Sequence, residues 1–179
     1  MIYQAIYIVF CFILDFWISL IVGIDYAAGF LVFIPSLGFG SLILVSKKMN
    51  LLDALMWVMT VGFIYGLFIP GNLFLYPILF AVVMLLVRIW STNLNESVFE
   101  LLILCLLAIL IKDYLLFLYM QTTGITVMNV IYWIKTYLFM SIVGNAFFLI
   151  LIVYLYRYVN KIQYEFMQRK QKKEHVNWR

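Results

Sequence analysis

Charged side chains are scarce in this chain. Lysine, arginine, aspartate and glutamate together make up 11% of its 179 residues, whereas about 25% is usual for soluble domains. Hydrophobic residues make up 67%, and the charges gather in short connections and in a basic C-terminal segment. This pattern leaves no room for a soluble catalytic domain. The sequence therefore predicts a protein that works within a lipid bilayer or at its surface.

Histidine and cysteine are also scarce. The only histidine is His175, and no His-Glu-x-x-His, paired-glutamate or glycine-rich phosphate motif occurs. Membrane hydrolases and transferases need clustered acid–base groups or metal ligands at one depth, so we expect no enzyme, no cofactor and no metal site. Cys11 and Cys105 lie in apolar segments without metal-ligand spacing. We interpret both as small residues of the core or of the lipid-facing surface, and not as a disulfide.

Long apolar runs account for most of the chain. A membrane-spanning helix needs about 20 mostly apolar residues. On that basis the sequence predicts an all-α integral membrane protein with six transmembrane helices, at residues 3–24, 28–46, 51–69, 73–90, 97–119 and 132–156. These form one domain, 1–156, and a basic cytoplasmic tail, 157–179, follows it. Turns are expected at 24–26 and 70–72. Asn50 and Ser97 are typical residues for helix starts.

The basic residues indicate which way the spans are oriented. Lys47 and Lys48 follow the second span, Arg88 closes the fourth, and seven more basic residues lie from Arg157 onward. Because basic loops stay in the cytoplasm, an even number of spans places both termini there. The basic tail either only sets this topology or also binds anionic lipid or a partner. The residues that would make such contacts are Arg169, Lys170, Lys172 and Lys173.

One acidic residue lies deep in the first predicted span. Asp15 is about 18 Å along that helix, where an ionisable side chain costs about 2.5–3.5 kcal/mol. Its sequence neighbours are apolar, so its partner must come from another helix, and Asn145 in the sixth span lies at a similar depth. We interpret Asp15 and Asn145 as a candidate interhelical polar clamp with a bond of about 0.6–2 kcal/mol. A substrate or ion site at Asp15 is the alternative.

A second group of charges lies toward the outer ends of spans five and six. Lys112 and Asp113 are adjacent in one helix, so their side chains diverge by about 100° and are not expected to pair. We expect Lys112 to extend outward to the membrane surface. Asp113 is expected to form an outer-side ion pair with Lys135 at the start of the sixth span.

Helix-breaking and small residues mark two further features of the spans. Pro35 falls inside the second span and is predicted to kink it. Gly62 and Gly66 are four residues apart in the third span, a spacing typical of a face on which another helix packs closely.

Five segments, spread over nearly all the spans, carry a resemblance to a known family: Phe12-Ile13-Leu14-Asp15, Phe33-Ile34-Pro35, Gly62-Phe63-Ile64-Tyr65-Gly66, Ile111-Lys112-Asp113-Tyr114 and Ser141-Ile142-Val143-Gly144-Asn145. Together they resemble MreD, the small multi-span membrane protein of the bacterial rod-shape system, in its Gram-positive forms. Gly66 stands where that family often has an aspartate, and a Pro-Thr that often precedes the family's last asparagine is missing.

The resemblance implies a non-catalytic scaffold of cell elongation and peptidoglycan synthesis that maintains cell shape from the bacterial cytoplasmic membrane. Its implied partners are an MreC-like membrane protein and the complex of RodA with a class B penicillin-binding protein, and no nucleic acid. It also implies a six-helix plan shared with the substrate-binding components of energy-coupling-factor vitamin transporters. Such a component is the alternative function. The short connection after the first span and the bulky side chains within that span argue against it.

Overall fold

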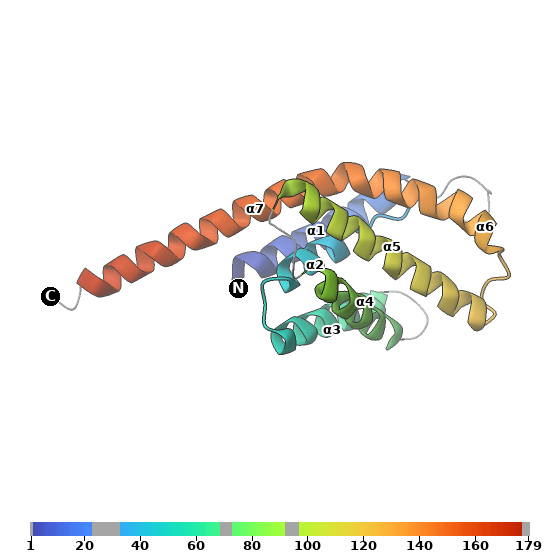
Figure 1. Cartoon of the computed structure of the whole chain (residues 1–179), viewed down its shortest axis with the longest axis horizontal. Helices are drawn as coiled ribbons and strands as arrows, with labels where there is room; N and C mark the ends of the chain where they lie inside the picture. Colours follow the sequence, from blue (N-terminus) through green and yellow to red (C-terminus); the bar gives the residue numbers. More distant parts are fainter. Residues whose placement is uncertain (1, 23–32, 69–72, 92–96, 177–179) are drawn as a thin grey trace.

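The computed structural model describes residues 2–22, 33–68, 73–91 and 97–176, which are helical apart from short turns and contain no β-strand (Figure 1). The turns predicted at 24–26 and 70–72 lie outside the described residues. The elements in chain order are α1 (Ile2–Val22), α2 (Leu37–Ser46), α3 (Leu51–Phe68), α4 (Leu75–Ser91), α5 (Val98–Thr122), α6 (Val130–Trp133), the π-helix η1 (Ile134–Leu138) and α7 (Phe139–Val176).

Four of the described helical stretches are long and apolar enough to cross a membrane. They are α1, α3, α5 and the continuous stretch from Val130 to Phe166. The other two apolar helices are shorter: at 1.5 Å per residue, α4 covers about 25 Å and α2 about 15 Å. By the length and composition of these helices, the chain is a multi-pass membrane protein whose described residues are mainly helical. The arrangement of six spans stays a prediction.

The helix starts predicted from polar residues are confirmed. α3 begins directly after Asn50. At the start of α5, the Ser97 hydroxyl oxygen accepts a hydrogen bond from the backbone N–H of Glu100 at 3.2 Å. A side-chain oxygen at this position satisfies one of the N–H groups that a helix leaves unpaired at its start.

The prediction that the second span is a helix kinked at Pro35 is wrong, because the helix there, α2, is only ten residues long. Residues 33–36 are not helical, and α2 begins at Leu37. Proline lacks an N–H and disfavours the helical conformation of the residue before it. The helix therefore starts after Pro35 instead of passing through it.

α2 lies at the centre of the bundle. All ten of its residues are buried, and it packs against α1, α5 and α7. Its residues are apolar on every face apart from Ser41 and Ser46, as is typical of a helix surrounded by others. The hydroxyls of both serines donate to backbone carbonyls three residues earlier, Gly38 and Ile43, so both hydroxyls are satisfied within α2 itself.

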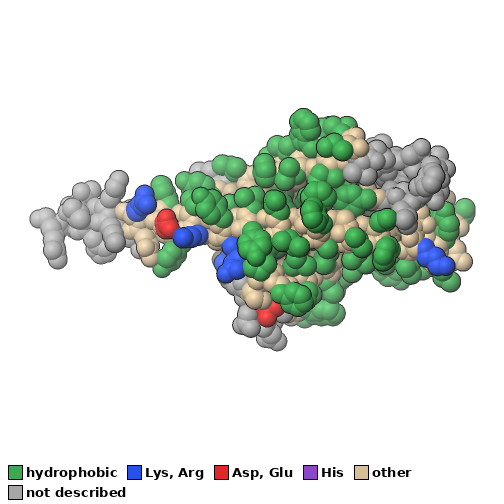
Figure 2. All heavy atoms as spheres, turned by 90° about the horizontal axis from the view of Figure 1, so that it is seen from above, with side chains coloured by type: hydrophobic (Ala, Val, Ile, Leu, Met, Phe, Trp, Pro, Cys, Tyr) green, Lys and Arg blue, Asp and Glu red, His purple; other side chains and the backbone are tan. Residues whose placement is uncertain are grey.

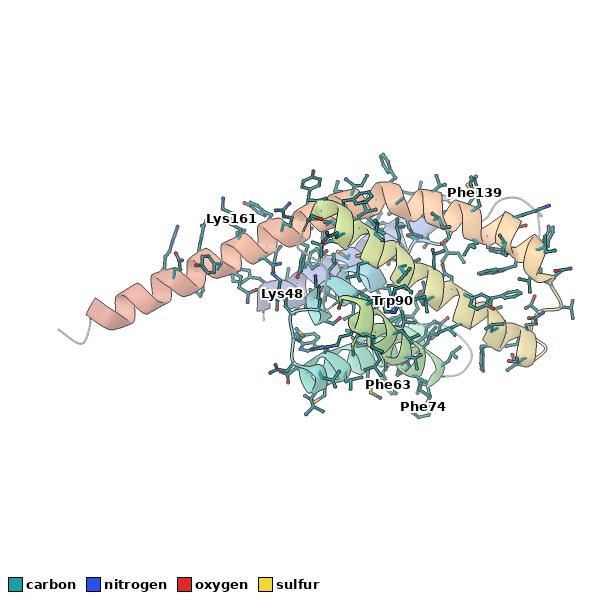
Figure 3. All side chains as sticks on the ribbon, viewed as in Figure 1. Lys48, Phe63, Phe74, Trp90, Phe139 and Lys161 are labelled. Carbon is teal, nitrogen blue, oxygen red and sulfur yellow. The ribbon has the colours of Figure 1, made fainter. Side chains whose placement is uncertain are left out.

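α3 and α4 form a hairpin that is packed through glycines. Gly62 and Gly66 are both buried. A Cβ at Gly62 would lie 2.8 Å from Cα of Pro77, and one at Gly66 would lie 2.9 Å from the carbonyl oxygen of Leu73. The absence of side chains there lets the two backbones approach closely, so the predicted packing face is the one on which α3 meets the start of α4. Phe63 and Phe74 mark the outer side of this hairpin in Figure 3.

Aromatic rings join the hairpin to the central helix. Tyr65 of α3 lies 4.9 Å from Tyr76 and 5.7 Å from Phe80, both of α4, between ring centroids. Phe80 in turn lies 4.6 Å from Phe39 of α2. These distances are within the range in which aromatic pairs attract one another.

α7 continues well beyond the predicted end of the sixth span at residue 156. It runs unbroken to Val176 and projects past the start of α1 (Figure 1). The Tyr7 hydroxyl donates to the carbonyl of Ile152 at 3.1 Å, and the rings of Tyr3 and Phe166 lie 6.2 Å apart. The first part of the predicted tail is therefore a helical extension that packs on α1.

The outward surface of the bundle is apolar. Figure 2 shows hydrophobic side chains over most of the visible bundle, with basic side chains mainly toward the end from which α7 projects. On α1, Phe16 and Trp17 are 64% and 60% exposed. Apolar surface of this extent is what lipid tails or neighbouring apolar helices cover in a membrane protein.

Candidate functional site

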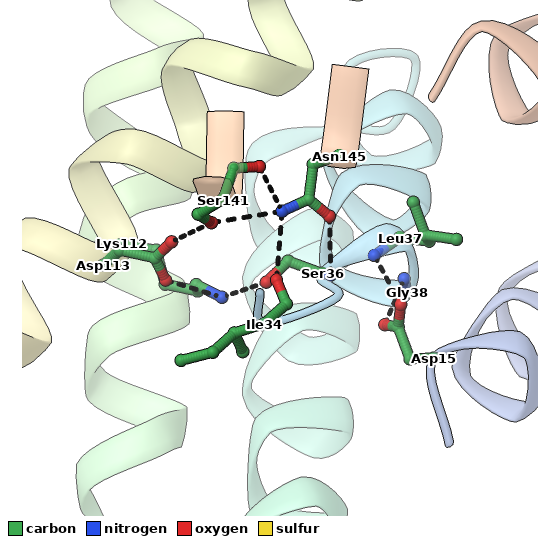
Figure 4. A network of polar contacts seen from close by, with 9 residues as sticks. All are labelled: Asp15, Ile34, Ser36, Leu37, Gly38, Lys112, Asp113, Ser141 and Asn145. Carbon is green, nitrogen blue, oxygen red and sulfur yellow. Dashed lines mark hydrogen bonds and ion pairs between the residues drawn. The ribbon is translucent and has the colours of Figure 1, made fainter. Parts of the chain in front are cut away.

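Asp15 of α1 binds the start of the broken helix. Its two carboxylate oxygens accept hydrogen bonds from the backbone N–H groups of Leu37 and Gly38, each at 2.7 Å (Figure 4). These are among the N–H groups that α2 cannot pair internally, and the positive end of the helix dipole favours a carboxylate there. Asp15 therefore caps α2 from a neighbouring helix.

Asn145 of α7 binds the non-helical residues that precede α2. Its Oδ1 accepts from the backbone N–H of Ser36 at 2.9 Å, and its Nδ2 donates to the carbonyl of Ile34 at 3.0 Å. The side chain is fully buried. Because irregular backbone within a membrane must find its hydrogen bonds inside the protein, Asn145 supplies partners that a regular helix would have supplied itself.

In the described residues, Asp15 and Asn145 therefore form the predicted polar clamp only indirectly, through a shared turn. The structure brings Asp15 and Asn145 to one turn, residues 34–38, where each binds different backbone groups and no hydrogen bond joins the two side chains. The sequence predicts a similar depth for the two residues, but that prediction takes the second span to be a regular helix. Such a span would have offered no free backbone groups to bind.

Lys112 points inward, and the expectation that it extends to the membrane surface is wrong. It is only 8% exposed, and its Nζ donates to the Ser36 hydroxyl at 2.6 Å and lies 3.0 Å from a carboxylate oxygen of Asp113. The expectation that these neighbours cannot pair is also wrong, because the four-carbon lysine side chain can fold back toward the next residue. Ser36 is available because the chain is not helical there.

Asp113 completes the network and does not bind Lys135. Its second carboxylate oxygen accepts from the Ser141 hydroxyl of α7 at 3.1 Å, and Asn145 donates to the carbonyl and the hydroxyl of Ser141 at 2.8 and 3.2 Å. Lys135 is exposed on η1. The predicted outer-side ion pair is therefore wrong, since both carboxylate oxygens of Asp113 already have inward partners.

The polar network so defined consists of Asp15, residues 34–38, Lys112, Asp113, Ser141 and Asn145, drawn from α1, α5, α7 and the start of α2 (Figure 4). The positive charge of Lys112 is balanced by Asp113, and Asp15 faces the positive end of a helix dipole. Each polar side chain of the network is hydrogen-bonded within the protein. Chemically, the arrangement fixes the point at which a span is interrupted.

The contacts of Ser36 and Ser141 in this network were not predicted from the sequence. Ser36 stands in the N-cap position of α2, although its own hydroxyl forms no cap and instead accepts from Lys112. Serine is a preferred N-cap residue, and a proline inside a helical pattern tends to end or kink the helix at the residue before it, so Pro35-Ser36 could have been interpreted as a helix start. Ser141 stood in the sequence only as the first residue of the last segment that resembles MreD, one turn before Asn145, and no contact was predicted for it.

The remaining predicted residues lie away from this network. Of the four tail residues, the structure describes the side chain of Arg169 alone, which is exposed on α7; the side chains of Lys170, Lys172 and Lys173 lie outside the described residues. Cys11 and Cys105 are free, as predicted, and of the two predicted locations, core or lipid-facing surface, both lie in the core. Within the described ranges no group of three or more histidine, cysteine or acidic residues could hold a metal ion.

Comparisons with known proteins give no relative for this chain: no family model matches it, and neither a curated protein nor a solved structure does so.

Proposed function

We propose that this chain is a non-catalytic membrane scaffold of bacterial cell elongation, similar to MreD. In this proposal it crosses the cytoplasmic membrane six times with both termini inside. It binds an MreC-like membrane protein and helps to organise the complex of RodA with a class B penicillin-binding protein. It acts by docking to other helices and carries out no chemistry of its own.

The observation that carries the proposal is the composition of the polar network. Four of the five segments that resemble MreD contribute to it: Asp15, Ile34, the pair Lys112 and Asp113, and the stretch from Ser141 to Asn145. Residues that lie far apart in the sequence thus meet in one network that fixes the start of α2. We expect this of residues that define a family because they specify its fold. The fifth segment holds the packing glycines of the hairpin.

The bonding of these residues also favours a scaffold over a vitamin carrier. A carrier needs polar groups that face a cavity and remain available to its ligand. Here Asp15, Lys112 and Asn145 are bonded to the chain itself, while the outward faces are apolar. Apolar faces with small-residue contacts associate with other helices in a membrane.

Co-purification in mild detergent tests the proposal. The full chain, tagged and co-expressed with an MreC-like protein from the same genome, should retain that partner, whereas an unrelated tagged multi-span protein should not. Asp15→Ala should lower the retained amount, because the start of α2 loses its cap. Ser19→Ala is the matched control on the same helix, where the hydroxyl donates to the Asp15 carbonyl.

Two results would contradict the scaffold function. One is failure to recover the MreC-like protein with the unaltered chain. The other is recovery of a tightly bound vitamin or of an energy-coupling module, which would establish the carrier function instead.

A further inference from the structure

An open recess lies at the end of the bundle where α7 projects from it. Its volume is about 750 Å³, within the range of small-molecule sites. It is bounded by the start of α1, the turn between α2 and α3, the first turn of α3 and the extension of α7. The side chains around it are those of Gln4, Lys48, Met49, Asn50, Asp53, Asn160, Lys161, Gln163 and Tyr164.

The lining combines cations with hydrogen-bond acceptors. Lys48 and Lys161 face this recess from different elements, and Asp53 is the one acidic residue among its described lining residues. Figure 3 labels both lysines at the end of the bundle from which α7 projects. The Nζ of Lys48 lies 5.8 Å from the centre of the Tyr156 ring, a cation–π contact that holds the lysine at the recess wall. The lining carries a net positive charge and therefore attracts an anion.

The side chain of Gln163 has an oxygen atom without a partner among the described residues. Its side-chain oxygen is buried and has no hydrogen-bond partner within the part of the chain that the structure describes. Buried polar atoms in folded proteins nearly always have a partner, so this acceptor calls for a donor from outside the chain. A hydroxyl group is such a donor, and a bare phosphate diester is not.

The recess lies where the polarity of α7 changes. Up to Tyr156 the helix is mainly apolar, and from Arg157 it carries Asn160, Lys161 and Gln163. Tyr158 and Tyr164 are both exposed here, and tyrosine is enriched where membrane meets water. The recess therefore opens at the level of lipid headgroups, next to the apolar surface that lipid tails cover.

We propose that this recess binds the headgroup of a phosphatidylglycerol-type phospholipid. The phosphate lies between Lys48 and Lys161, and the hydroxyls of the headgroup glycerol donate to Gln163 and Asp53. The inference rests on membrane residence alone and is independent of the proposed role in cell elongation.

Native mass spectrometry of the full chain in detergent, titrated with single phospholipids, tests the proposal. Phosphatidylglycerol should bind more tightly than phosphatidylethanolamine. Lys161→Gln should weaken phosphatidylglycerol binding about fivefold, the effect of one basic residue at a membrane surface. Lys135→Gln, which removes an exposed lysine on η1, is the matched control and should leave binding unchanged. Lys161→Arg keeps the charge and should bind like the unaltered chain.

A second pair of titrations separates headgroup recognition from charge. Gln163→Ala should weaken the binding of phosphatidylglycerol and leave that of phosphatidic acid unchanged, because phosphatidic acid has a phosphate and no headgroup hydroxyls. Equal losses from Lys161→Gln and Lys135→Gln would overturn the proposal, as would unchanged phosphatidylglycerol binding in Gln163→Ala. Displacement of the lipid by an equal concentration of glycerol 3-phosphate would assign the recess to a soluble phosphate compound instead.

Discussion

The two parts of this bundle are held together by different means. Around α2, the contacts that fix the backbone are directional: Asp15 and Asn145 bind backbone groups of residues 34–38 at 2.7 to 3.0 Å. In the hairpin of α3 and α4, they are steric, with Gly62 and Gly66 against the backbone of the opposite chain segment. The difference follows from the backbone. A broken helix has unpaired N–H and C=O groups that require polar partners, whereas two regular helices need only close contact.

The two cysteines make this comparison measurable. Cys11 of α1 and Cys105 of α5 are completely buried beside α2, and the hairpin helices contain none. Labelling of these thiols therefore reports on the opening of the α2 region. Unfolding in mixed micelles reports on the stability of the whole chain.

Removal of the carboxylate of Asp15 should have the largest effect. Asp15→Ala leaves two buried N–H groups of α2 unpaired, and each hydrogen bond to a charged group is worth about 1.5–3 kcal/mol. We expect a loss of roughly 4 kcal/mol in mixed-micelle unfolding and faster labelling of Cys11. Ser19→Ala should change neither quantity, and slow labelling in Asp15→Ala would contradict the capping role.

Removal of the positive charge of Lys112 should have the next largest effect. Lys112→Met leaves Asp113 buried without its cation, and breaking such a pair typically costs about 3 kcal/mol. Replacement of both residues, as Lys112→Met with Asp113→Leu, should be less destabilising than Lys112→Met alone, since no buried charge remains. A double variant that is less stable than both single variants in the same unfolding assay would show that the pair does not act as a unit.

Adding a methyl group at a hairpin glycine should have a smaller effect on stability, and the structural change should be confined to the hairpin. Gly62→Ala places a Cβ 2.8 Å from the backbone of Pro77, and overpacking of this kind costs about 1–3 kcal/mol. The free energy of unfolding should fall by about 2 kcal/mol without faster thiol labelling, and the exposed Thr60→Ala on the same helix should be neutral. Rapid labelling of Cys105 in Gly62→Ala would show that the two regions open together.

The smallest effect is expected at Lys135. Since this lysine is exposed and Asp113 is bonded to Lys112 and Ser141, Lys135→Ala should change stability by less than about 0.5 kcal/mol. A loss of stability comparable to that of Lys112→Met would instead support the outer-side ion pair between Asp113 and Lys135 that the sequence predicts.

Sequence reasoning succeeded where the backbone is regular. The starts of α3 and α5, the packing glycines of α3 and the free state of both cysteines follow from local residue types and from helical spacing. It failed around Pro35, because it treated the proline as a kink within a helix. In a kinked but continuous helix, most backbone groups of residues 34–38 would be paired. The prediction therefore gave no reason for Lys112 to turn inward, or for Asp15 and Asn145 to bind the same turn without touching each other.

A double-mutant cycle on Asp15 and Asn145 tests the central claim most directly. Both residues bind residues 34–38, so once Asp15→Ala has loosened this turn, Asn145→Ala should cost less than it does alone. We expect a coupling of about 1 kcal/mol in mixed-micelle unfolding, whereas the distant pair Asp15→Ala and Gly66→Ala should be additive. Additive losses for Asp15 and Asn145 would contradict the claim that the two residues hold the same break in α2.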